Sequence, residues 1–155
     1  MKGDERIIGY LNDYLTRELT IVNQYFLGAK MMENWGLDGL AKVFRDVSFD
    51  EMRDAERIIE RILYLEGHPN LQRLSSVNVG EDPVEHLRLA AESERSAIET
   101  LRQGVELAVE VGDYGTRGMV AEMLEEEEEH LYFFERQLQV VERIGVENYL
   151  GNYVS

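Results

Sequence analysis

Apolar residues recur in alternating steps of three and four along four long segments of the chain, the spacing that places them on one face of an α-helix. Glycine or proline separates the segments, and Asp82 followed by Pro83 and Glu85 is a typical helix start. The C-terminal tail, 146–155, is expected to add a short fifth helix. The pattern predicts long helices at about residues 4–35, 38–66, 83–111 and 114–144.

The connections between these helices differ in length. Those at Gly36 and Gly112 are short, so the helices that they join should lie antiparallel. The segment from Gly67 to Asp82 is long, and structureless segments of that length are uncommon inside compact domains. A crossover along the length of a bundle would explain it. The predicted fold is therefore all-α, a ferritin-like four-helix bundle that forms a single domain over residues 1–155.

The helical pattern repeats with an offset of 76 residues. Glu18 corresponds to Glu94, and Glu51 corresponds to Glu127, each at a position where an apolar face would otherwise continue. The chain is thus two helical hairpins of matching register, as a pseudo-twofold bundle requires. The flanking apolar positions follow the same offset, and they include Ile8, Leu11, Leu15, Phe44, Val47 and Ile58 with Val84, Leu87, Ala91, Val120, Met123 and Phe134.

The polar residues on these faces indicate a metal site. Asp54 and His130 lie three residues after Glu51 and Glu127, so each pair shares a helix face. Unpaired carboxylates in a core cost several kcal/mol each, and a pair of divalent cations would remove that cost. Oxygen and imidazole donors suit iron, manganese or zinc. Glu127 alone, within the acidic run 125–129, would be read as part of a solvated face, but four glutamates in matching register favour a metal centre.

Other notable side chains have simpler interpretations. Met52 directly follows one of the core glutamates, so it points about 100° away from the interior, where methionine usually fills a gap at an interface. Trp35 and Tyr25 are expected in the core or at an interface. His68, in a proline-containing loop, and His86, in a first helical turn, are expected at the surface.

Composition narrows the possible functions. A formal net charge of −15 argues against binding to nucleic acid and suits a protein that attracts cations, although acidic helical proteins are often simply soluble. No apolar stretch approaches the ~18–20 residues of a membrane span, and the N-terminus lacks the apolar core of a signal peptide, so no membrane contact and a cytoplasmic location are expected. The absence of cysteine excludes thiolate metal sites.

A set of short motifs spread over nearly the whole chain resembles the bacterioferritin family. Together they are highly specific. The motifs are MKGD at 1–4, NQYF at 23–26, NWGL at 34–37, DEM at 50–52, IERIL at 59–63, LEG at 65–67, PNLQ at 69–72 and NYL at 148–150.

This resemblance implies a hollow shell of 24 subunits, in which a di-iron centre within each bundle oxidises Fe(II) with dioxygen or peroxide and feeds a ferric mineral. It also implies haem b between pairs of subunits, ligated by one methionine from each, and Met52 stands at that position. Glu51 matches a bridging carboxylate, and Tyr25 matches an aromatic residue beside the centre. The iron ligands of the family match Glu18, Glu94, Glu127 and His130.

The chain departs from the family at Asp54, where the pattern has a histidine. Aspartate is shorter and adds a negative charge, so Asp54 could ligate the second iron, act through a water molecule, or leave the site impaired. Some bacterioferritin shells resemble mixtures of ferroxidase-active and haem-binding subunits. A chain that keeps Met52 while losing the histidine is a candidate for the haem-rich partner.

Three functions therefore remain open. The first is an iron-storage subunit with ferroxidase activity, in a homo- or hetero-oligomer served by a reductant partner. The second is a haem-carrying, ferroxidase-impaired subunit that shares its shell with a second bacterioferritin subunit. The third is an acidic helical interaction protein that holds no metal.

Overall fold

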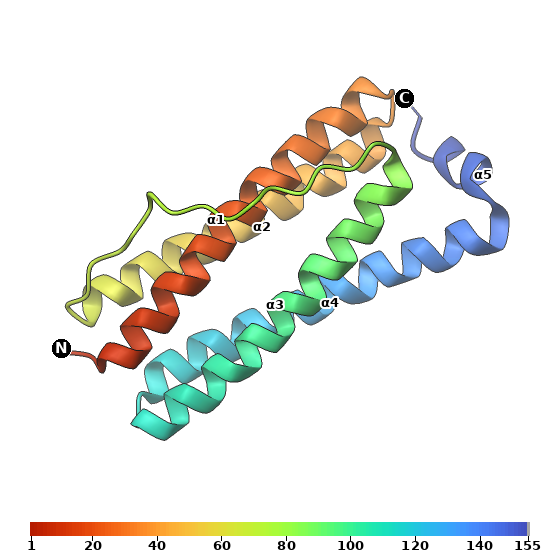
Figure 1. The fold of residues 1–155 in the computed structure, drawn as a ribbon. Helices are drawn as coiled ribbons and strands as arrows, with labels where there is room; N and C mark the ends of the chain where they lie inside the picture. Colours follow the sequence, from red (N-terminus) through yellow and green to blue (C-terminus); the bar gives the residue numbers. More distant parts are fainter. Residues whose placement is uncertain (155) are drawn as a thin grey trace.

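The computed structural model describes residues 1–154, and these residues form helices and no strands. The five helices follow one another along the chain as shown in Figure 1. The four long helices agree with the predicted segments to within two residues at each end, and the short C-terminal helix is confirmed. They are α1 (Glu5–Asn34), α2 (Asp38–Tyr64), α3 (Pro83–Val111), α4 (Tyr114–Ile144) and α5 (Val146–Gly151).

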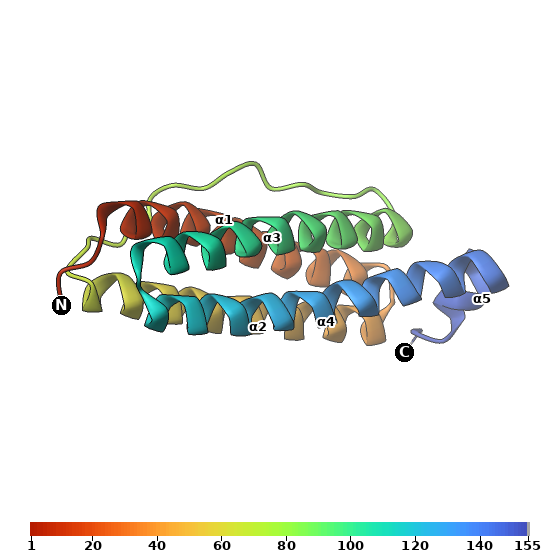
Figure 2. The same cartoon turned by 90° about the horizontal axis from the view of Figure 1, so that it is seen from below.

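The helices form two antiparallel hairpins, α1 with α2 and α3 with α4, which lie against each other lengthwise (Figures 1 and 2). The connection between α2 and α3 runs along the bundle, as predicted (Figure 2). Side chains of α1 hold it in place. Asn12 accepts a hydrogen bond from the Asn70 amide at 2.8 Å, and Thr20 accepts one from the Ser75 amide at 2.8 Å. Because these α1 residues lie eight positions apart, they share the helix face beneath the crossover.

Local sequence sets the helix boundaries. Asp82 caps α3 by accepting a hydrogen bond from the Glu85 amide at 2.9 Å, and Pro83 follows at the first helical position. Asp113 caps α4 in the same way, through the Thr116 amide at 3.0 Å. Between these two helices Gly112 has a φ of 75°, a left-handed conformation that glycine adopts without strain.

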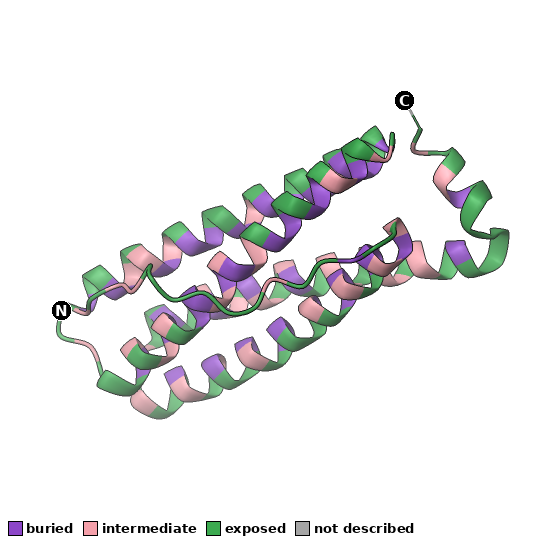
Figure 3. Cartoon of the chain, turned by 45° about the horizontal axis from the view of Figure 1, so that its top comes forward, coloured by how far each residue is buried: buried purple, intermediate pink, exposed green. Residues whose placement is uncertain are grey.

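Buried residues line the inward faces of the helices (Figure 3). They form two apolar clusters, one towards each end of the bundle. The first cluster contains Tyr25, Phe44 and Phe134, and the second contains Leu11 and Ile58. The core is therefore divided, and the layer between the clusters is where the predicted carboxylates lie. Among the described residues, no helix is long and apolar enough to cross a membrane.

Two expectations about side chains are wrong. His86 is buried rather than exposed, because the end of the crossover folds over it: its Nε2 lies 3.1 Å from the Gly80 carbonyl oxygen, and its ring packs edge-on against Trp35. His68 is exposed, as expected. At the start of α1, Ile7 is fully buried and its neighbour Ile8, which the periodicity placed in the core, is only partly buried.

Candidate metal centre

Four glutamates, one from each long helix, meet in the layer between the two apolar clusters. All are nearly inaccessible to solvent, with exposed fractions of 2% or less. Each takes the place of a core residue on its helix, so the same periodicity that buries the apolar positions also buries the carboxylates. They are Glu18 on α1, Glu51 on α2, Glu94 on α3 and Glu127 on α4.

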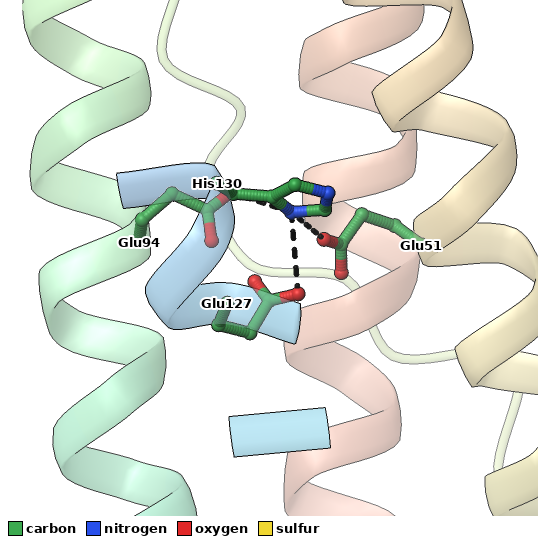
Figure 4. A group of neighbouring side chains, drawn as sticks. All are labelled: Glu51, Glu94, Glu127 and His130. Carbon is green, nitrogen blue, oxygen red and sulfur yellow. Dashed lines mark ion pairs between the residues drawn. The ribbon is translucent and has the colours of Figure 1, made fainter. Parts of the chain in front are cut away.

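The ligand-type atoms of this layer form two groups, and within each group they lie within 4.8 Å of one another. The first group contains Glu51, Glu94, Glu127 and His130 (Figure 4). Here His130 Nδ1 lies 3.2 Å from Glu51, 3.5 Å from Glu127 and 3.8 Å from Glu94. The second group combines Glu18 and Glu51 with Asp54, and Glu51 therefore belongs to both groups.

Six buried metal-donor atoms in this layer lack a hydrogen-bond partner among residues 1–154. Both carboxylate oxygens of Glu51, which has an exposed fraction of 0%, make no hydrogen bond to any atom of residues 1–154. A buried polar atom without a partner costs about 1–3 kcal/mol, so a fold does not accumulate them without a reason. Bound divalent cations would satisfy all of them at once, and the donor set fits such ions. The other unpartnered atoms at this centre are Glu18 Oε2, Glu94 Oε2, Glu127 Oε1 and His130 Nδ1.

Burial and mutual repulsion change the protonation of the carboxyl groups. Burial, reinforced by Glu18 and Glu127, raises the pKa of Glu51 well above its usual range. Burial raises the pKa of Glu18 to about 7, and burial together with Glu126 raises the pKa of Asp54 to about 9. The metal-free centre therefore holds protons at neutral pH that a bound cation would displace.

Glu127 is the exception. Burial opposes its ionisation, but the neighbouring Glu94 carboxyl and His130 ring outweigh burial and lower the pKa of Glu127 to about 2. The proximity of Glu127 raises the pKa of His130 despite burial of the ring, whereas burial and Glu127 raise the pKa of Glu94 well above its usual range. The Tyr25 hydroxyl donates to Glu94 Oε1 at 2.6 Å, which confirms Tyr25 as an aromatic residue beside the centre.

Three neighbours of the centre were not singled out from the sequence. Asp50 approaches the outer nitrogen of His130, with 3.5 Å between Oδ2 and Nε2, and Arg57 lies 3.9 Å from Asp54. Tyr14 is buried beside Glu18, which together with burial raises the pKa of the Tyr14 hydroxyl. The spacing in the sequence could have identified two of them, because Tyr14 lies one turn before Glu18 and Arg57 lies one turn after Asp54, on the same helix faces.

Met52 lies outside this centre, on the outer face of α2, as its position after Glu51 predicted. Its exposed fraction is 40%, and Phe49, three residues earlier on the same face, is exposed to a similar extent. The guanidinium of Arg45 stacks over the Phe49 ring at 5.1 Å, and Arg45 shares a shallow pocket with the exposed Phe26 of α1. Exposed apolar side chains grouped in this way are typical of a surface that another molecule covers.

Comparison with known proteins agrees with the fold. The family described as a ferritin-like domain matches residues 8–144. The bacterioferritin of Streptomyces coelicolor is 42% identical over 154 residues, which is 99% of this chain and 92% of that protein. Those of Mycobacterium avium and Rhodobacter capsulatus are 40% and 39% identical over 155 and 149 residues, covering 100% and 96% of this chain and 98% and 92% of theirs. The chain has this helical topology and is similar to bacterioferritins along nearly its entire length, so it belongs to the bacterioferritins of the ferritin-like family.

Proposed function

We propose that this protein is an iron-storage subunit that takes up Fe(II) at the buried centre, oxidises it and passes ferric iron to a mineral. One observation carries the proposal: buried carboxylate oxygens from all four long helices converge without hydrogen-bond partners among the described residues. Bound iron supplies the redox chemistry, in which each Fe(II) gives one electron to dioxygen or peroxide. The bacterioferritin relatives support iron as the metal.

The residues of the chain would bind the two cations in two overlapping groups. Glu94, Glu127 and His130 would hold one cation, Glu18 and Asp54 the other, and Glu51 would bridge them. Tyr25 orients Glu94 through its hydroxyl, which leaves the second oxygen of that carboxylate free for the metal. Because the metal-free carboxyls hold protons at neutral pH, uptake of Fe(II) releases protons, and the surrounding negative charge favours entry of the cation.

Stopped-flow oxidation of Fe(II) tests this proposal. Glu18→Ala and Glu127→Ala each remove one ligand, and each should slow the oxidation by roughly tenfold or more, since loss of even an indirect partner of a metal ligand costs 10–100-fold. Glu125→Ala is the matched control, because Glu125 is exposed on the same helix, and it should leave the rate unchanged. If both ligand variants oxidise Fe(II) at the wild-type rate, the assignment of the centre is wrong.

A second function is favoured by Asp54 together with the exposed Met52. We propose, as the alternative, a haem-carrying subunit whose own ferroxidase activity is impaired and which shares a shell with a second bacterioferritin subunit. The apolar surface around Met52 suits a haem b held between two subunits by one methionine from each. In this case the homo-oligomer oxidises Fe(II) slowly, Asp54→His restores the rate, and Met52→Leu abolishes the Soret band of bound haem. No gain from Asp54→His would count against it.

We further propose that the chain forms one domain and assembles into a cytoplasmic shell of 24 subunits, either homo- or hetero-oligomeric, which a reductant partner serves. Large apolar side chains are exposed along α4 and at the start of α5, and they support assembly. They are Tyr132, Val140, Ile144 and Val146. Sedimentation velocity gives the mass of the assembly, and a monomer would overturn this proposal.

The third function, an acidic interaction protein without metal, predicts no Fe(II) uptake at all.

A further inference from the structure

The two halves of the centre differ at one pair of positions. The 76-residue offset relates Glu51 to Glu127 with the same side chain, but it relates Asp54 to His130. As a result one ligand group contains an imidazole, whereas the group of Glu18, Glu51 and Asp54 contains only carboxylate oxygens. Imidazole suits zinc, iron and nickel, whereas carboxylates suit magnesium, calcium and manganese. The two metal positions thus have different chemical preferences.

Two divalent cations alone do not neutralise the charge of the centre. Five carboxylates and one neutral histidine carry one more negative charge than two divalent cations can balance. Arg57 adds a positive charge at the edge of the centre, where its Nη1 lies 3.9 Å from Asp54 Oδ1. Arg57 also contacts Glu122 at 2.6 Å and Glu126 at 3.6 Å, so it is held between α2 and α4.

Arg57 acts from the solvent side. It lines a pocket of about 340 Å³ between α2 and α4, and Asp54, Arg53 and His130 also line that pocket. A cation that reaches Asp54 from this pocket must share its carboxylate with the guanidinium. Arg57 therefore weakens metal binding at the oxygen-only position more than at the position that contains His130.

We propose that Asp54 and Arg57 make the two metal positions unequal: a tight position at His130 that selects for cations that favour nitrogen donors, and a weaker, oxygen-only position at Asp54 that discriminates less against Mn(II). This inference rests on the proposed metal-binding function and adds the specificity of each position. Asp54 acts as a ligand, and Arg57 acts as a positioning residue through the charge that it places beside Asp54.

Titration calorimetry of the metal-free oligomer with Co(II) and with Mn(II) separately tests the proposal without measuring iron oxidation. Co(II), which accepts nitrogen donors, should bind in two steps per subunit that differ by at least roughly tenfold in affinity. Mn(II) should bind more weakly than Co(II) at both positions, with the smaller difference at the weak one. Anomalous diffraction from crystals with less than one Co(II) per subunit should find the metal beside His130, and crystals with excess Co(II) should show it beside Asp54 as well.

Variants separate donor type from charge. Asp54→His should bring the two Co(II) steps together and weaken Mn(II) binding roughly tenfold, whereas Asp54→Asn keeps an oxygen donor and should retain the unequal Co(II) steps. Arg57→Gln should strengthen Mn(II) binding roughly tenfold, because Asp54 loses its competing cation. Arg53→Gln is the matched control, since Arg53 lines the same pocket but pairs with Asp50, and it should leave Mn(II) affinity unchanged.

The outcomes distinguish this inference from the function on which it rests. Two equal Co(II) steps in the wild type, or Co(II) found first beside Asp54, would overturn the inequality while leaving metal binding intact. An equal response of Arg57→Gln and Arg53→Gln would overturn the role of Arg57. If neither Co(II) nor Mn(II) binds, both the inference and the proposed function fail.

Discussion

Replacing Glu51 by leucine should stabilise the metal-free protein and abolish its stabilisation by metal. Glu51 is fully buried at the point where the two ligand groups overlap, and neither of its carboxylate oxygens has a hydrogen-bond partner within residues 1–154. Its raised pKa means that most of its cost in the metal-free protein is the burial of a neutral but unsatisfied acid. Leucine is of similar volume and has no polar atom to satisfy.

The size of the effect follows from this arrangement. An unsatisfied buried polar group costs about 1–3 kcal/mol, and replacing buried charged groups by apolar ones of similar volume has stabilised other proteins by about 1–4 kcal/mol. His130 loses its 3.2 Å contact with Glu51 but keeps the one with Glu127 at 3.5 Å. We therefore expect a net gain of about 2 kcal/mol, which raises Tm by roughly 4–8 °C for a chain of this length.

Differential scanning calorimetry with EDTA and with saturating Co(II) measures both parts of the prediction. The wild-type protein should gain about 3 kcal/mol when the free metal concentration is about 100 times its Kd, whereas Glu51→Leu should gain much less. Glu60→Leu, an exposed substitution on the same helix, should change neither Tm. A metal-free Glu51→Leu protein that melts below the wild type would refute the reasoning, because it would show that the carboxylate is satisfied.

The remaining predictions concern pH and one helix cap. Because the folded pKa values of Glu18 and Asp54, about 7 and about 9, lie above those of the unfolded chain, the metal-free protein should lose Tm as the pH rises from about 5 to 9, and bound metal should suppress this loss. Burial lowers the pKa of His86, so the stability contributed by the neutral ring is present above pH 6.5 and is lost in more acidic solution. The fluorescence of Trp35, whose ring lies 5.8 Å from that of His86, should change below pH 6.5, and His86→Phe should remove this change. Asp113→Ala removes the cap of α4 together with a partly buried ion pair to α2 and should lower the free energy of unfolding by about 2–3 kcal/mol in thermal or urea unfolding of the metal-free protein.

Much of the fold was predictable because helical periodicity, caps and glycines act locally. The start of α3 at Pro83 and the end of α4 at Ile144 agree with the predicted boundaries, and both are marked by residues next to them in the sequence. The four glutamates of the centre were predictable for the same reason, since a residue in register with a buried face is itself buried. Their convergence needed only the topology of two hairpins and one crossover.

What could not be predicted depends on contacts between distant segments. His86 lies in a first helical turn, and only the crossover at Gly80 and the side chain of Trp35 cover it. Likewise, Arg57 was one of many charged residues on α2 until the structure placed it beside Asp54 and two glutamates of α4. Periodicity gives the face on which a side chain lies but not the neighbour that approaches it from another element.

The length of the helices and the cost of the centre are connected. Each long helix has 27–31 residues, so it extends about 40–46 Å and carries apolar turns on both sides of the acidic layer. One apolar cluster at each side, around Phe44 and around Ile58, supplies the stability that the unsatisfied carboxylates between them remove. A shorter bundle would have only one such cluster, and the same centre would remove a larger share of its stability. At Glu51, stability and the proposed metal binding therefore make opposite demands, and the metal-free protein keeps the carboxylate only because the two clusters outweigh its cost.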